Sequence, residues 1–171
     1  MSLIVRRKSL LGANTSGKIW LYRNGVISPL IGDFITDGYQ YGPSFSQTKG
    51  ETDLMIAATS PYNIRGGRTF TGLNPIPAKY IGKTLHCKVT LCNVQRDSFA
   101  RLYLSENVVS VSDVENVNDS GAFINSAFSE VTMNDTVDLS LPVTQAGYLS
   151  VMMYKGYPGL VSAEFEEIWI E

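Results

Sequence analysis

The side chains best suited to bind a ligand are tyrosines and arginines in stretches rich in Gly, Pro, Ser and Thr, which read as loops. A tyrosine ring offers a sugar an apolar face, and its hydroxyl can hydrogen-bond. Tyrosine and arginine are equally enriched at subunit interfaces, and tyrosines can also pack beneath long loops. These three uses stay open from the sequence. The candidate ligand-binding residues are Tyr39, Tyr41, Tyr62, Arg65, Arg68 and Tyr157.

Residue sets that could catalyse a reaction are scarcer. Hydrolysis by a nucleophile and a base needs a histidine, or an equivalent base, beside a serine or cysteine. The single histidine, His86, lies in the middle of an expected strand, far from any sharp turn. Glu164 and Glu166 share one strand face roughly 6–7 Å apart, a separation that glycosidases use. One carboxyl of such a pair must be desolvated, and this face is expected to meet solvent, so we predict no catalytic residue and no enzyme.

Metal and thiol chemistry is also weakly supported. Cys87 and Cys92 lie in one expected strand at positions that face opposite sides, so they cannot bridge each other. We expect two free thiols, with Cys87 buried, and no metal site, because His86 faces away from Cys87. The default is therefore no cofactor. A structural calcium ion is the alternative, because one polar loop carries oxygen ligands without the spacing of an EF-hand. These residues are Asp113, Glu115, Asn118 and Asp119.

Length and composition place the chain among globular proteins. At 171 residues the chain fits one domain, and 44% hydrophobic with 18% charged residues argues against extended disorder. No apolar run approaches the roughly 20 residues that cross a bilayer, so we expect no membrane insertion. The basic cluster near the start follows an apolar run instead of preceding one, so we expect synthesis in the host cytoplasm without a signal peptide.

Charge is distributed unevenly along the chain. Residues 1–105 hold 13 Lys and Arg against 5 Asp and Glu, whereas residues 106–171 hold 1 against 11. In a sandwich the two halves can interleave and neutralise each other. Alternatively, they form basic and acidic faces that associate head-to-tail or around a ring. No basic cluster interleaves with aromatics in a recognisable motif, so we expect no nucleic-acid binding.

The elements that must position these residues are strands. Short alternating apolar runs, separated by Gly and Pro, predict roughly nine to eleven strands and no helix. We therefore expect an all-β fold, an antiparallel two-sheet β-sandwich resembling a jelly roll, over residues 18–171. Residues 1–17 form an N-terminal arm that either frays or docks on a neighbouring chain, and part of it could be a cloning remnant. The arm carries Arg6, Arg7 and Lys8.

Several connections are also predicted. Pro158-Gly159 suits a type II turn, so residues 147–171 are expected to form a β-hairpin, and residues 84–94 and 99–104 to form another. Asn24-Gly25 ends the first strand with a hairpin signal. The apolar phase changes after Glu167, which predicts a β-bulge at Glu166-Glu167. The first and last strands are expected to share a sheet.

Two segments carry a family resemblance. IWLYRNG…PLIGDF, at residues 19–34, resembles the start of small jelly-roll proteins encoded among tail genes of phages and prophages of Gram-positive bacteria. GYLSVMMYKG…VSAEFEEIWIE, at residues 147–171, looks like the last two strands of carbohydrate-binding-module jelly rolls. Where the phage-like family has Gly-Gly-Trp, this chain has Gly32-Asp33-Phe34. The resemblance carries over no functional residue.

What the resemblance implies is a non-enzymatic, oligomeric virion protein with a surface for host glycans. The leading hypothesis is therefore a structural or adhesion component of a phage tail or fibre, located in the virion, with further copies or other virion proteins as partners. The first alternative is a free-standing carbohydrate-binding module. The second is a glycoside-active enzyme, which rests on Glu164 and Glu166 alone.

Overall fold

The structure is a computed structural model. It describes residues 20–23, 26–29, 39–49, 53–60, 65–72, 75–94, 97–110, 112, 114, 126–156 and 158–170. The predicted arm, with Arg6, Arg7 and Lys8, lies outside the described residues. So do two candidate binding residues, Tyr62 and Tyr157, and the four expected calcium ligands, Asp113, Glu115, Asn118 and Asp119.

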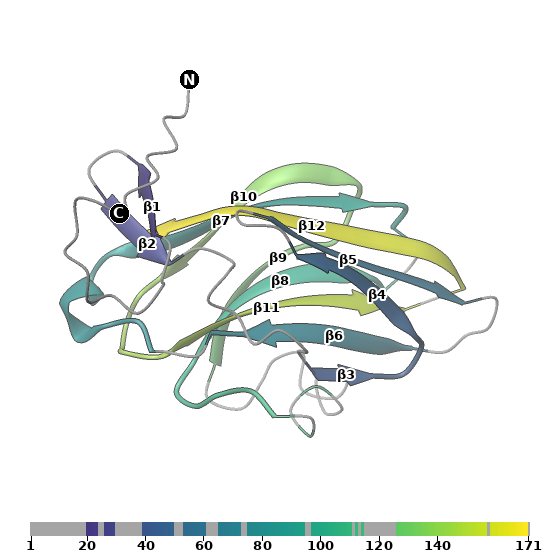
Figure 1. Ribbon diagram of the computed structural model, residues 1–171, viewed down its shortest axis with the longest axis horizontal. Coiled ribbons are helices and arrows are strands. Elements are labelled where there is room, and N and C mark those ends of the chain that lie inside the picture. Colours follow the sequence, from purple (N-terminus) through teal and green to yellow (C-terminus); the bar gives the residue numbers. More distant parts are fainter. Residues whose placement is uncertain are drawn as a thin grey trace.

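Ten of the described strands form two five-stranded antiparallel sheets that face each other (Figure 1). Sheet I has the order β10 (Asp135–Pro142), β7 (Thr84–Cys92), β12 (Gly159–Ile170), β5 (Asp53–Ser60) and β4 (Phe45–Lys49). Sheet II has the order β3 (Tyr39–Tyr41), β6 (Gly66–Thr71), β11 (Tyr148–Lys155), β8 (Phe99–Ser105) and β9 (Ser126–Val131). The predicted fold class, an all-β antiparallel sandwich of two sheets, is confirmed.

The core lies between the two sheets because strand alternation sends every second side chain inward. In β7 the inward side chains are buried and the outward ones are half-buried until the strand ends at the exposed Cys92. In β12 the inward set changes phase after Glu166, where the register against β7 shifts, so the predicted bulge is confirmed. The core includes Leu54, Ile56, Phe70, Leu85, Val89, Leu102, Leu104, Val151, Phe165 and Ile168.

Successive strands mostly cross between sheets, and this overturns two predicted hairpins. β11 pairs with β6 and β8 in sheet II, whereas β12 pairs with β5 and β7 in sheet I. β7 and β8 are likewise in different sheets. Gly159 has a φ of +113°, as the predicted turn requires. The turn residues set the chain reversal, but long-range packing of two apolar strands into one core decides which strands pair.

The first hairpin is confirmed, but its place is not the predicted one. β1 (Trp20–Arg23) and β2 (Val26–Pro29) flank residues 24–25 and pair antiparallel with each other. They form a separate two-stranded ribbon beside β12, whose sheet neighbours are β7 and β5 (Figure 1). The expectation that the first and last strands share a sheet was therefore wrong. None of the helical segments in the described part of the chain has the length and apolar character that a membrane crossing needs.

Candidate functional site

The outer face of sheet II carries a row of aromatic and charged side chains. Ala100, Leu102 and Leu104 of β8 lie in the core, so alternation places the residues between them on the outer face. That outer set continues across the neighbouring strands β11 and β9, because their registers align it in rows. Its members are Phe99, Arg101, Tyr103, Phe128, Glu130, Ser150, Met152 and Tyr154.

Arg101 is the centre of this set. Its guanidinium Cζ lies 3.7 Å from the Phe99 ring centroid and 4.3 Å from the Phe128 ring centroid. Arg101 Nε donates to Glu130 Oε2 at 2.6 Å, and Nη1 donates to the Tyr103 hydroxyl at 3.1 Å. The side chain of Arg101 is only 9% exposed, whereas that of Glu130 is 36% exposed. Stacking and charge-assisted hydrogen bonds therefore fix the orientation of the guanidinium.

The stack continues on both sides of Arg101. The rings of Phe99 and Tyr154 are stacked, with centroids 4.8 Å apart and planes 12° apart. Tyr103 meets Phe128 at 5.7 Å with the planes tilted by 47°. β9 is one of the two edge strands of sheet II, and Phe128 is 38% exposed there. We call Phe99, Arg101, Tyr103, Phe128, Glu130 and Tyr154 the aromatic–arginine ladder; its open end is Phe128 with Glu130.

The ladder offers donors and acceptors without a net charge, because Arg101 and Glu130 neutralise each other. Burial raises the pKa of Tyr103 to about 12, although its hydrogen bond and proximity to Arg101 act in the opposite direction. Tyr103 therefore stays protonated at neutral pH while its oxygen accepts from Arg101. A neutral surface that combines an aromatic ring with hydrogen-bonding groups suits a polar, uncharged ligand.

The middle of this face is covered by the chain itself. After β8, Val109 and Val114 pack against Tyr103, Met152 and Tyr154, and this cluster is separate from the core between the sheets. The Ser105 hydroxyl donates to the Asn107 carbonyl at 2.7 Å, and Val114 N–H donates to the Ser110 carbonyl at 3.3 Å. We call residues 105–110, 112 and 114 the covering segment. Tyr103 and Met152 are fully buried beneath it.

The predicted binding residues fall in several places. Tyr39 and Tyr41 lie in β3, so their assignment to a loop was wrong, and Tyr39 packs against the covered cluster. Arg65 Nη2 lies 3.6 Å from Asp97 Oδ2, and both side chains are exposed. Arg68 in β6 donates to Gln40 of β3 and to Gln47 of β4, which joins the two sheets at one edge. Among the candidate side chains that the structure describes, Tyr39 packs against the cluster that contains Tyr103 and Tyr154, and a ligand role for these residues stays a prediction.

Sequence reasoning missed the ladder itself. The sequence predicts a strand over residues 99–104, but the aromatic residues predicted to bind a ligand all lie in stretches that read as loops. The available signal was the set Phe99, Arg101 and Tyr103 at every second position, opposite Ala100, Leu102 and Leu104. An aromatic–cation–aromatic row on the outer face of a strand indicates either a covered face or a binding surface.

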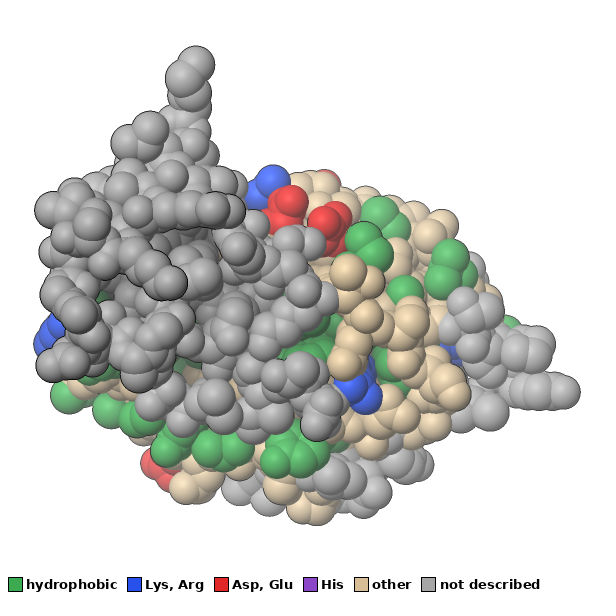
Figure 2. All heavy atoms as spheres, in the orientation of Figure 1, with side chains coloured by type: hydrophobic (Ala, Val, Ile, Leu, Met, Phe, Trp, Pro, Cys, Tyr) green, Lys and Arg blue, Asp and Glu red, His purple; other side chains and the backbone are tan. Residues whose placement is uncertain are grey.

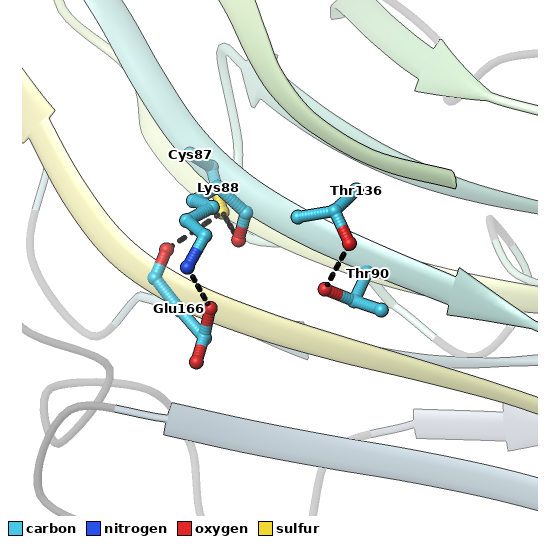
Figure 3. Close-up of polar contacts among 5 residues, drawn as sticks. All are labelled: Cys87, Lys88, Thr90, Thr136 and Glu166. Atoms are coloured by element: carbon cyan, nitrogen blue, oxygen red, sulfur yellow. Dashed lines mark hydrogen bonds and ion pairs between the residues drawn. The ribbon is translucent and has the colours of Figure 1, made fainter.

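The outer face of sheet I differs. Lys88 Nζ lies 2.6 Å from Glu166 Oε2, and the hydroxyls of Thr90 and Thr136 are 3.0 Å apart (Figure 3). Glu164 is half-buried opposite Thr90, and Glu166 is half-buried in its ion pair with Lys88, so both glutamates lie on a partly exposed face. His86 stacks on Trp169, with ring centroids 4.8 Å apart. Within the described part of the chain, no three His, Cys, Asp or Glu side chains are grouped to hold a metal ion.

Both thiols are free, with Cys87 buried and Cys92 exposed, as predicted. Burial raises the pKa of the Cys87 thiol.

The ion pairs Lys88–Glu166 and Arg101–Glu130 each join the basic first part of the sequence, residues 1–105, to the acidic second part, residues 106–171. On the face shown in Figure 2, described acidic and basic side chains accordingly lie singly or in small groups.

No protein-family model matches the chain, and neither does any curated protein sequence. Among solved structures, one of carbohydrate-binding modules from the β-sandwich superfamily aligns over 82% of this chain and 58% of its own, with 15% identity and a TM-score of 0.48. The family 30 carbohydrate-binding module of a cellulosomal cellulase of Clostridium thermocellum aligns over 90% of this chain and 96% of its own, with 12% identity and a TM-score of 0.44. The enzymatically active domain of tailspike protein 4 of bacteriophage CBA120 aligns over 81% of this chain and 19% of its own, with 12% identity and a TM-score of 0.44. The chain thus spans less than two thirds of the first and third of these structures.

Proposed function

We propose that this protein is a non-catalytic glycan-binding β-sandwich, and that its ligand contacts the open end of the aromatic–arginine ladder. The observation that carries the proposal is Phe128, an exposed ring on an edge strand, held against Arg101 with the Glu130 carboxylate beside it. The apolar face of a sugar packs on an aromatic ring, and its hydroxyls hydrogen-bond to charged and polar groups at the rim.

The ladder is organised before a ligand arrives. Arg101 is clamped by two rings and two hydrogen bonds, so the ring of Phe128 and the carboxylate of Glu130 are held in place. A site that needs no reordering loses less entropy on binding. A carboxylate has about four lone-pair directions, so Glu130 can accept from a sugar hydroxyl while Oε2 accepts from Arg101.

The size of the open end favours a small ligand over a protein partner. A stable protein interface buries about 800 Å² on each partner. The open end of the ladder is one ring and one carboxylate, because Arg101, Tyr103 and Tyr154 are buried behind it. A sugar unit matches that surface, whereas a subunit interface would need a much wider apolar area.

The test compares two exposed apolar side chains near the same edge of sheet II. Phe128→Ala removes the ring, and Phe128→Tyr retains it. Met133→Ala is the control, since Met133 is more exposed, at 64%. A glycan array with the native protein identifies a ligand, and calorimetry measures its affinity. We expect at least a tenfold loss for Phe128→Ala, with little change for Phe128→Tyr and Met133→Ala. Native-like thermal unfolding of each variant shows that it is folded. Absence of any retained glycan, or equal binding by Phe128→Ala, contradicts the proposal.

The biological setting that fits this activity is attachment: we propose a role in the tail or fibre of a phage-like particle, as the resemblance of residues 19–34 and 147–171 implies. Because two ion pairs already join the basic and acidic parts within one chain, association of copies would depend on the basic arm, residues 1–17. Light scattering with and without that arm tests this role. A strict monomer at tens of micromolar with the arm present counts against it and favours a free-standing carbohydrate-binding module.

A further inference from the structure

We propose that the covering segment restricts the glycan face to short or terminal sugar epitopes and excludes the interior of a long polysaccharide. The inference rests on the proposed glycan binding and adds to it the class of glycan that the site accepts. It is carried by the position of Val109 and Val114, which lie where a longer sugar chain would have to cross the sheet.

The outer face of sheet II is wide enough for an extended ligand, because five strands spaced about 4.8 Å apart contribute to it. Its central strands are closed, however. Tyr103 of β8 and Met152 of β11 are fully buried, and Tyr154 of β11 is nearly so. Val109 and Val114 form one buried cluster with these three side chains. A glycan that enters at Phe128 on β9 therefore meets the covering segment at the next strand, β8.

The covering segment is anchored well enough to act as a fixed wall. Both valines are themselves buried, so unseating them would return their apolar surface to water. The Ser105 hydroxyl donates to the Asn107 carbonyl at 2.7 Å, and the Tyr148 carbonyl, 3.4 Å away, is its alternative acceptor, which places the start of the segment beside β11. A weakly bound sugar does not displace such contacts, so the length of the site is set by the fold.

The surface left open has the dimensions of one sugar unit and part of a second. It consists of the exposed Phe128 ring and the half-exposed Glu130 carboxylate, with Phe99 only partly accessible on the far side of Arg101. Because the Arg101 guanidinium is buried and lies within 4.3 Å of both ring centroids, it leaves no further open surface between the two rings. The ligand is thus a chain end or a short branch.

The experiment measures affinity against glycan length for the native protein. β-Linked gluco-, galacto- and manno-oligosaccharides, from monosaccharide to hexasaccharide, are titrated by calorimetry. We expect affinity to reach a plateau at the disaccharide, with less than a threefold gain for any longer member. A gain of tenfold or more between disaccharide and hexasaccharide would overturn the restriction while leaving glycan binding intact. Absence of binding by every series would overturn both proposals.

Variants of the covering segment supply a second measurement. Val109→Asp with Val114→Asp places charges in the apolar contact and should unseat the segment, so the hexasaccharide should gain at least fivefold over the disaccharide. Val108→Asp is the matched control, because Val108 is exposed in the same segment, and its length profile should remain native. If the double variant folds and keeps the native plateau, the segment does not limit the site. If the double variant fails to fold, the affinities of the native protein for oligosaccharides of increasing length still test the proposal.

Discussion

The two sheets present opposite kinds of outer face. On sheet I, most outward side chains of β7 and β12 are half-buried polar groups such as Lys88, Thr90 and Glu166, and Trp169 near the end of β12 is a buried exception. On sheet II, the outward side chains of β8 and β11 are nearly all buried, including Arg101 and Ser150. The same strand alternation thus produces a solvated face in one sheet and a second, partly polar core in the other.

The difference comes from what covers each face. Sheet II has the covering segment, with Val109 and Val114, so β11 is buried on both sides as a strand in the middle of a three-layer packing would be. The groups beneath the segment need partners because water cannot reach them. This explains why sheet II has the clamped arginine and the paired hydroxyls, and why the glycan contact that we propose is placed at its open edge.

The largest expected effect comes from comparing two ion pairs, one on each outer face, that have the same N–O distance. Arg101–Glu130 and Lys88–Glu166 both measure 2.6 Å, but the Lys88 side chain is 37% exposed and that of Arg101 only 9%. We expect Arg101→Met to lower the free energy of unfolding by about 3 kcal/mol, through lost packing, stacking and hydrogen bonds. Lys88→Met should change it by less than about 1 kcal/mol, because water screens an exposed pair.

Urea denaturation at neutral pH measures both variants, with the slope against urea checked for constancy. Glu166→Gln and Glu130→Gln extend the comparison from the acidic side of each pair. Equal losses for Arg101→Met and Lys88→Met would show that the cover on sheet II does not change the local environment as we infer.

A second test uses the ionisation of Tyr103 beneath the cover. Its pKa of about 12 in the folded protein lies above the ordinary value of 10.0, which the unfolded chain would have. Between these values the unfolded chain loses its proton first, so the free energy of unfolding falls as pH rises above 10 and is unaffected below it. The Tyr103→Phe variant has no hydroxyl to ionise at this position, so its stability does not fall for this reason. The stability of the native protein relative to Tyr103→Phe should therefore drop by about 2 kcal/mol between pH 9 and pH 12. A constant difference would contradict the buried position of this hydroxyl.

The sequence predicts a structural feature well when that feature depends on residues that are close together along the chain. The inward set of β7, the bulge in β12 and the states of Cys87 and Cys92 follow from strand alternation alone, and all were predicted correctly. Strand pairing was not predictable in the same way. A Pro158-Gly159 turn is equally compatible with a hairpin and with a crossing between sheets, since both strands bury an apolar face.

The candidate site shows the same limit. Arg101 and Glu130 are far apart in the sequence, and only the pairing of β8 with β9 brings them together. Tyr39 and Tyr41 were assigned to a loop because Gly and Pro surround them, and a three-residue strand is too short to show alternation. The sequence predicts binding aromatics in loops, whereas the aromatic–arginine ladder lies on the regular strands β8, β9 and β11, on the side opposite their core residues.

The smallest effects are expected from two hydroxyl pairs that span neighbouring strands. Thr71 and Ser150 lie 2.8 Å apart and are fully buried on sheet II, whereas Thr90 and Thr136 lie 3.0 Å apart on the open face of sheet I. Thr71→Val should cost about 1–2 kcal/mol, because it leaves the buried Ser150 hydroxyl without this partner. Thr90→Val should lie within about 0.5 kcal/mol of the native protein, since water replaces the lost bond and valine suits a strand.

A double-mutant cycle separates the free energy of the hydrogen bond between the two hydroxyls from the effect of changing the shape of each side chain. Removing both buried hydroxyls, in Thr71→Val with Ser150→Ala, should cost less than the sum of the single variants, because no orphaned polar group remains. The same cycle on Thr90 and Thr136 should show no coupling, because each hydroxyl can turn to water when its partner is lost. Equal coupling in the two cycles would mean that the outer faces differ in composition but not in solvation, and the covering segment would then no longer account for the burial of sheet II.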